Sequence, residues 1–195
     1  MALPYPCRLR CGFATQLPMD SDNHQQNYFE LFGIKPTFRI DEQAIEKTYL
    51  QMQALFHPDR FATASAQERR IAAQQSAYLN EARDVLMDAC ARADYLLKLQ
   101  GCAVNPDASM SDNDFLMEQM EYRERLEEVA TQQSSEPAVA LCTEIERQNT
   151  EINKDFEQAY DTAMFDTAQS LLARMRFMKK LKAEAKAVIA SKESL

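Results

Sequence analysis

The sequence predicts an all-α protein, and two observations support that prediction. Its 195 residues include only three glycines and no tryptophan, whereas residues that favour helices, such as alanine, leucine, glutamine and glutamate, are abundant. Apolar side chains also recur at steps of three and four residues, which is the spacing of one helix face. With 46% apolar residues, the chain can bury a core as one domain or as two small ones.

Net charge indicates the class of partner, and cysteine content indicates the cellular compartment. A formal net charge of −8 argues against nucleic-acid binding, because proteins of that class need surplus lysine and arginine to neutralise phosphates. It favours a protein partner. The five cysteines lack the regular spacing of a disulfide framework, so we expect a reducing cytoplasm. No apolar run in the sequence approaches the length that a membrane helix requires.

Residues 1–26 are expected to form a disordered or extended segment outside the fold. The first eighteen residues contain Arg8 and Arg10, no acidic residue and three prolines. An upstream start, with Met19 rather than Met1 as the natural beginning, is a simpler explanation than a transit peptide. Prolines would spoil the amphipathic helix that a transit peptide needs.

The first long helix is expected to begin at Asp41 and to stop at His57. Asp41 is placed as an N-cap, and Ile40 and Ile45 have the spacing of a hydrophobic staple. The apolar stripe of this helix consists of Ile45, Tyr49, Met52 and Phe56. Pro58 cannot continue the backbone hydrogen bonds and pushes the residue before it out of the α region, so the helix ends there.

A second long helix follows the loop RFATASAQ and should pack antiparallel to the first. Its predicted core stripe is Ile71, Tyr78, Ala82 and Val85. The tripeptide His57-Pro58-Asp59 would then lie at an exposed tip. An earlier short segment could cover the open side of the pair with Tyr28, Phe29, Leu31 and Phe32. Gly101 is placed to cap the next helix, RADYLLKL.

The second half of the chain is expected to form a three-helix bundle. Ser111 and Asp114 occupy capping-box positions before the first helix, the second starts near Ser135, and Asp166 is expected to cap the last. The predicted stripe of the second helix is Cys142, Ile145, Ile152, Phe156 and Tyr160. That of the last is Ala168, Leu171, Met175, Met178, Lys182 and Ile189.

The first bundle helix carries two apolar faces. One holds Phe115, Tyr122, Leu126 and Val129, and the other holds Leu116, Met117 and Met120. A bundle helix needs one stripe for the core, so the second face is surplus and predicts a binding site. Charged residues surround this face: Glu121, Arg123, Glu124, Glu127 and Glu128. Phe177 of the last helix could extend it. The alternative is that this face packs on the first half of the chain.

The order of these motifs resembles a known module. YFELFG, a helix, HPDRF and a helix ending in NEARDVLMD are similar to a J-domain, which docks on DnaK-type ATPase chaperones. The longer run QQSAYLNEARDVLMDACARADYLLKLQG, followed by FLMEQMEYRERLEE, resembles the HscB family of J-type co-chaperones of iron-sulfur cluster assembly. This resemblance implies an L-shaped molecule with a J-domain in residues 27–101, a linker in residues 102–112 and a three-helix bundle in residues 113–195.

The resemblance implies a co-chaperone without an active site or cofactor of its own. It would bind an IscU-type iron-sulfur scaffold, deliver it to an HscA/DnaK-type chaperone and stimulate the ATPase of that chaperone. The implied chaperone-binding residues are Lys47, His57, Pro58, Asp59 and Arg60. The implied scaffold-binding residues are Leu116, Met117, Met120, Glu121, Arg123, Glu124, Glu128 and Phe177. J-domains generally present a basic face before the loop, where this chain has only Lys47.

Two other functions are compatible with parts of the pattern. A general J-domain adaptor would serve a broad-specificity DnaK-type folding chaperone, and a thiol or metal enzyme would need a reactive cysteine or a bound ion. Cys7, Cys11 and His24 fall short of the four ligands of a zinc site, so no metal is expected. Animal mitochondrial relatives carry paired Cys-x-x-Cys motifs. The chain lacks them, which favours a bacterial cytoplasm over the mitochondrial matrix.

Overall fold

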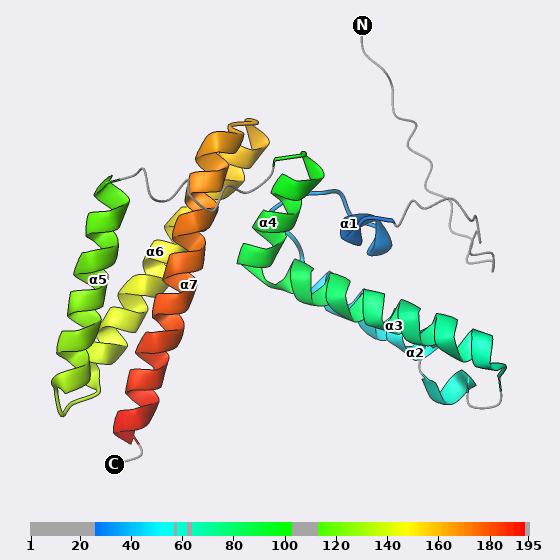
Figure 1. Cartoon of the computed structure of the whole chain (residues 1–195), viewed down its shortest axis with the longest axis horizontal. Coiled ribbons are helices and arrows are strands. Elements are labelled where there is room, and N and C mark those ends of the chain that lie inside the picture. The colour runs from blue at the N-terminus through cyan, green and yellow to red at the C-terminus, as the bar shows by residue number, and fades with distance from the viewer. Residues whose placement is uncertain (1–25, 57, 62–63, 103–112, 194–195) are drawn as a thin grey trace, which may run out of the picture.

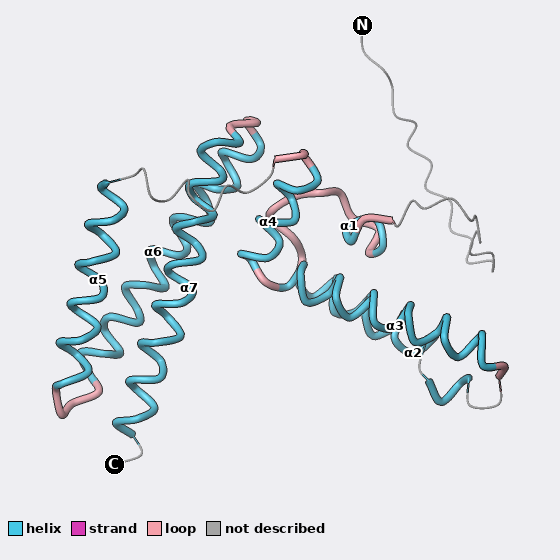
Figure 2. Tube along the Cα trace, in the orientation of Figure 1, coloured by secondary structure: helices cyan, strands magenta, loops and turns pink. Residues whose placement is uncertain are grey.

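The computed structural model describes residues 26–56, 58–61, 64–102 and 113–193, and within them every regular element is helical (Figures 1 and 2). The predicted all-α class is therefore confirmed. The elements are α1 (Tyr28–Leu31), α2 (Glu42–Phe56), the 3-10 turn η1 (Pro58–Phe61), α3 (Ala66–Met87), α4 (Ala89–Leu99), α5 (Asn113–Thr131), α6 (Glu136–Asp161) and α7 (Phe165–Glu193). The predictions on residues 1–25, His57 and Ser111 lie outside the described residues.

The molecule has two arms (Figure 1). The α2–α3 hairpin extends to one side, helices α5, α6 and α7 form the other arm, and α4 lies at the junction. One hydrophobic cluster is continuous through both arms, from Phe29 and Leu79 to Phe156 and Leu181. The arms are therefore parts of one packed structure, and the angle between them gives the L shape that the resemblance implies.

Helix α2 follows the local signals in its sequence. The Asp41 carboxylate accepts a hydrogen bond from the Ala44 amide at 3.0 Å, as expected of an N-cap. Ile45 is fully buried, while Tyr49 and Met52 are half-buried against the same core. The helix ends at Phe56, two residues before Pro58, which agrees with the predicted stop.

The predicted core stripe of α3 is correct at Ala82 and displaced by about one residue at its other three positions. The buried residues are Ala72, Leu79, Ala82 and Leu86, whereas Ile71, Tyr78 and Val85 are half-buried. Tyr78 instead lies beside α1, where its ring is 5.4 Å from that of Tyr28 and its hydroxyl donates to the Gln26 carbonyl. Apolar side chains occur on both faces, so spacing could not tell which one meets the centre of the core.

Helix α4 begins and ends at specific capping residues. Asp88 ends α3 and caps α4, because its carboxylate accepts from the Ala91 amide at 2.9 Å. Gly101 takes a left-handed conformation with φ +73°. The amide of Cys102 donates to the Leu97 carbonyl at 3.0 Å, and the amide of Gly101 donates to the Lys98 carbonyl at 3.0 Å. This is a Schellman C-cap, as the position of Gly101 predicts.

The stripe and cap predicted for α7 need correction. The buried residues are Ala168, Leu172, Met175, Met178, Leu181 and Ala185, whereas Leu171, Lys182 and Ile189 are half-buried. These buried residues face α6 and follow one another at steps of three and four along the helix. Asp166 lies inside the first turn, because Ala163 turns the chain at φ 57° and α7 starts at Phe165. The α6 stripe is confirmed.

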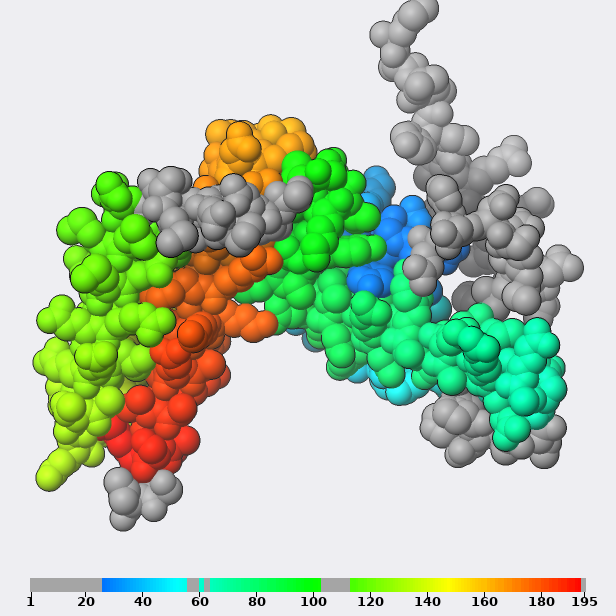
Figure 3. Space-filling view, viewed as in Figure 1, coloured from blue at the N-terminus to red at the C-terminus, as the bar shows by residue number. Residues whose placement is uncertain are grey.

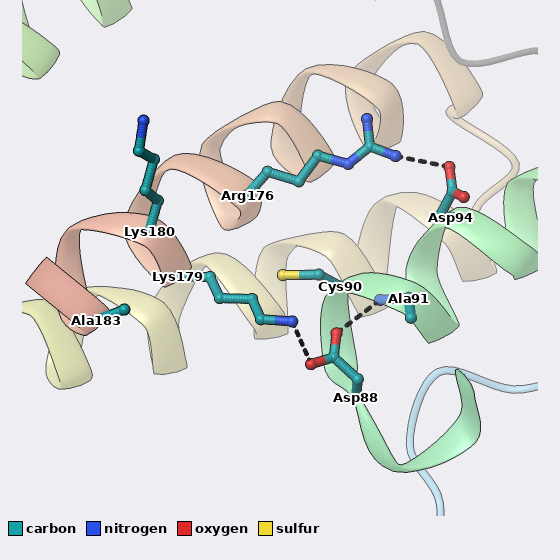
Figure 4. Close-up of a pocket in the computed structure, with 8 residues that line it drawn as sticks. All are labelled: Asp88, Cys90, Ala91, Asp94, Arg176, Lys179, Lys180 and Ala183. Atoms are coloured by element: carbon teal, nitrogen blue, oxygen red, sulfur yellow. Dashed lines mark hydrogen bonds and ion pairs between the residues drawn. The ribbon is translucent and has the colours of Figure 1, made fainter. Parts of the chain in front are cut away.

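Ion pairs between α4 and α7 connect the two arms (Figure 4). Lys179 donates to Asp88 at 2.5 Å, and Arg176 donates to Asp94 at 2.8 Å. Burial alone would raise the pKa of Asp88. Hydrogen bonds from Lys179 and the Ala91 amide outweigh burial and lower the pKa overall. This stabilisation is present above the pKa of the unfolded chain and is lost as the pH falls through the lower folded pKa.

We expect Asp88→Ala to lower the free energy of unfolding by about 1–2 kcal/mol, because it removes both the α4 cap and the Lys179 ion pair. Asp88→Asn keeps a capping oxygen and loses only the ion pair, whose Lys179 side chain is 60% exposed and screened by solvent. It should therefore cost less than about 1 kcal/mol. Urea unfolding of both variants measures the difference. Equal losses in the two would contradict the capping role.

Candidate functional site

The first candidate surface is the turn at the tip of the α2–α3 hairpin (Figure 1). Pro58 and Asp59 begin the η1 turn that separates the two helices, and Arg60 follows them. The exposed Arg60 side chain donates to the Ala54 carbonyl at 3.2 Å, near the C-terminus of α2. Lys47 is exposed on α2. His57 and the side chains of Pro58 and Asp59 lie outside what the structure describes.

Residues of the motif NEARD hold the two helices of the hairpin together. Arg83 donates to the Glu46 carboxylate at 2.8 Å and lies over the Tyr49 ring at 4.9 Å. The Tyr49 hydroxyl donates to Asn80 at 3.0 Å. Ala82 is fully buried. This motif therefore fixes α2 against α3, which determines where the turn between them is held.

The second candidate surface lies on α5 and consists of Leu116, Met117 and Met120, which we call the α5 patch. Their exposed fractions are 39%, 62% and 71%. On the opposite face of the helix, Phe115 and Tyr122 are buried in the bundle. The patch therefore does not pack on the described part of the first half of the chain, which argues against that alternative. Its predicted charged neighbours are also exposed: Glu121, Arg123, Glu124, Glu127 and Glu128.

Two interhelical ion pairs flank the buried face of α5. Arg125 donates twice to the Glu144 carboxylate on α6, at 3.0 and 2.5 Å, and this bond lowers the pKa of Glu144. Arg174 of α7 donates to Glu118 at 3.2 Å and lies 5.0 Å from the Phe115 ring centre. These contacts support the orientation in which Phe115 points inward and the α5 patch points outward. The excess of acids in α5 and bases in α7 was the available sequence signal.

Phe177 belongs to α7 and is half-buried where that helix packs against α5. Its ring meets Phe115 edge-to-face at a centroid distance of 5.9 Å and lies 6.4 Å from Tyr122. Both partners belong to the core face of α5 rather than to the α5 patch. Part of the Phe177 ring is therefore committed to holding the helices together, and only the remainder can meet a partner.

The described residues contain no group of three or more His, Cys, Asp or Glu side chains that could hold a metal ion. Cys90 and Cys102 are half-buried free thiols, and Cys142 is buried. Burial raises the pKa of the Cys90 thiol, which is the opposite of what a reactive cysteine needs. Across the described ranges, no helix is both long and apolar enough to cross a membrane.

Sequence comparisons identify relatives over most of the chain. A family model described as the HSCB C-terminal oligomerisation domain matches residues 111–186. The chain is 39% identical over 166 residues to a co-chaperone protein HscB homolog of Pseudoalteromonas atlantica, covering 81% of this chain and 93% of the relative. It is 37% identical over 160 residues to an HscB homolog of Vibrio vulnificus, covering 81% of this chain and 94% of the relative.

Solved structures share the fold. Chaperone HscB from Vibrio cholerae matches with a TM-score of 0.78 and 36% identity, covering 86% of this chain and 99% of that one. The human co-chaperone protein HscB matches with a TM-score of 0.79 over 91% of this chain and 93% of that one. At 24% identity, the human protein shows a common fold alone.

Proposed function

The chain belongs to the HscB family of co-chaperones, and we propose that it brings an IscU-type iron-sulfur scaffold to an HscA/DnaK-type chaperone and stimulates the ATPase of that chaperone. The observation that carries the proposal is the exposure of the α5 patch on one arm, while the other arm ends in the motif of a J-domain. Its relatives are named as co-chaperones, and no catalytic activity of the chain itself is part of this function.

The hairpin arm would bind the chaperone. The proposed contact residues are Lys47, His57, Pro58, Asp59 and Arg60. Stimulation of ATP hydrolysis requires that these residues bind the hydrolysis-competent conformation of the chaperone more tightly than its resting one, because a ligand shifts an equilibrium only through such a difference. ATP would be bound and hydrolysed entirely on the chaperone, and the turn would act as an allosteric ligand.

The bundle arm would bind the scaffold. Three large apolar side chains at the centre of the α5 patch can be desolvated by a partner, and methionine side chains repack readily against a new surface. The proposed rim is Glu121, Arg123, Glu124 and Glu128, with Phe177 contributing from α7. Charges at an interface rim mainly set specificity and association rate, so scaffold binding should weaken as salt increases.

The two proposed surfaces lie on different arms, far from each other along the molecule (Figure 3). Both partners could therefore bind one chain together, which would raise the effective concentration of the scaffold at the chaperone. We further propose that residues 27–101 and 113–195 are two domains joined by residues 102–112. The sequenced relatives named above are bacterial, which supports a bacterial cytoplasmic location.

The test mixes the purified full chain with an IscU-type scaffold and an HscA-type chaperone from the same organism. We expect a complex of all three proteins and greater ATPase stimulation with the scaffold than without it. The measurements are size-exclusion chromatography of the complex and phosphate release by the chaperone. Stimulation of a broad folding chaperone without any binding of the scaffold would contradict the proposal and would identify a general J-domain adaptor.

A further inference from the structure

A pocket of about 250 Å³ lies at the junction of the two arms. Its walls include Phe38 and Arg39 from the segment before α2, Arg92 from α4 and Lys154 from α6. Contacts between the arms border it. The rings of Phe38 and Phe156 are 4.8 Å apart, and Arg39 pairs with Glu157 at 3.4 Å.

Arg92 is the one charged residue that is buried among the described residues, with 6% of its surface exposed. Its Nη1 donates to the Leu86 carbonyl, and its guanidinium lies 5.1 Å from the Phe38 ring centre. The Nε atom is buried and has no hydrogen-bond partner in the described part of the chain. A guanidinium has five N–H donors, so these contacts leave the buried charge incompletely compensated.

The charges around the pocket are mainly positive. Arg39 and Lys154 are exposed at its walls, and Glu157, the one acid that lines it, already pairs with Arg39. Burial lowers the pKa of Arg92, and the charges of Glu42 and Asp88 oppose this effect. A concentration of positive charge is unusual for a chain with a formal net charge of −8. Electrostatics in this pocket therefore favour an anion.

We propose that this pocket binds a small oxyanion of the phosphate class. Oxyanions supply several acceptor atoms at once, and guanidinium groups match them with paired donors. Arg92 would provide the buried charge, with Arg39 and Lys154 closing over the anion from the other two segments. Because these segments belong to both arms, a bound anion ties the arms together. The pocket shares no residue with the proposed chaperone-binding and scaffold-binding surfaces, and its test needs neither partner.

The test titrates inorganic phosphate into the full chain while potassium chloride keeps the ionic strength constant. We expect the thermal unfolding midpoint to rise with phosphate and to saturate, since a ligand that binds only the folded state stabilises it. Arg92→Met should abolish this rise. Lys154→Gln should weaken phosphate binding about threefold, as for one exposed charge. Lys186→Gln removes an exposed charge on α7, a helix that does not line the pocket, and should leave the response unchanged.

Two results would overturn the proposal. One is a wild-type chain whose midpoint does not respond to phosphate at constant ionic strength. The other is an equal response in the wild type and in Lys154→Gln and Arg39→Gln, which would place any bound phosphate elsewhere. Lys154 and Arg39 have exposed side chains, so their variants should fold. They therefore test the pocket even if Arg92→Met does not fold.

Discussion

Asp59→Asn should abolish stimulation of the chaperone ATPase, with at least a tenfold loss of the stimulated rate at saturating concentration. The change removes one negative charge at almost constant volume. Asp59 lies in the η1 turn at the end of the hairpin arm. Under the proposal, its carboxylate accepts a charge-assisted hydrogen bond from the chaperone. Leaving the partner of a buried interfacial charge unpaired costs about 2–5 kcal/mol, which corresponds to more than a tenfold loss.

The measurement is steady-state phosphate release by the chaperone with increasing concentrations of the co-chaperone. Asp155→Asn is the matched control, because it makes the same chemical change at an exposed position of α6 on the other arm. We expect that control to retain full stimulation. Asp59→Asn should also keep the scaffold affinity and the unfolding midpoint of the wild type. Full stimulation by Asp59→Asn would refute the role of the turn.

Replacing both Met117 and Met120 with serine should weaken scaffold binding at least tenfold. These side chains are the most exposed members of the α5 patch, at 62% and 71%. They contribute little to the folded chain, so the free energy of unfolding should change by less than about 0.5 kcal/mol per site. Truncating a hot-spot side chain near the centre of an interface costs about 2 kcal/mol or more. The variant should still stimulate the chaperone ATPase when no scaffold is present.

Isothermal titration of the scaffold measures this affinity. Met164→Ser is a suitable control, because Met164 is 56% exposed at the α6–α7 turn and lies outside the α5 patch. Phe177 is left unchanged, because its packing on Phe115 and Tyr122 would mix loss of folding with loss of binding. Unchanged scaffold affinity in the double variant would remove the α5 patch from the proposed interface.

Sequence patterns predicted some parts of the candidate surfaces but not others. The outward face of α5 follows from helix geometry alone, because Phe115 and Tyr122 claim the opposite side for the core. The position of Phe177 does not, since a residue off the core stripe of α7 can point to solvent or to a neighbouring helix. The tertiary structure is needed to show how α7 is rotated beside α5 and that the Phe177 ring therefore packs on Phe115.

By itself, the sequence determined the helical class, the end of α2 before Pro58, the cap at Gly101 and the two faces of α5. Each of these depends on residues within a turn or two of one another, so local stereochemistry and helical spacing are sufficient. Only the tertiary structure decided which faces of α3 and α7 are buried and how Arg92 came to lie at the junction. Those outcomes depend on which distant helix supplies the opposing surface, and a single helix carries more than one face that could fill that place.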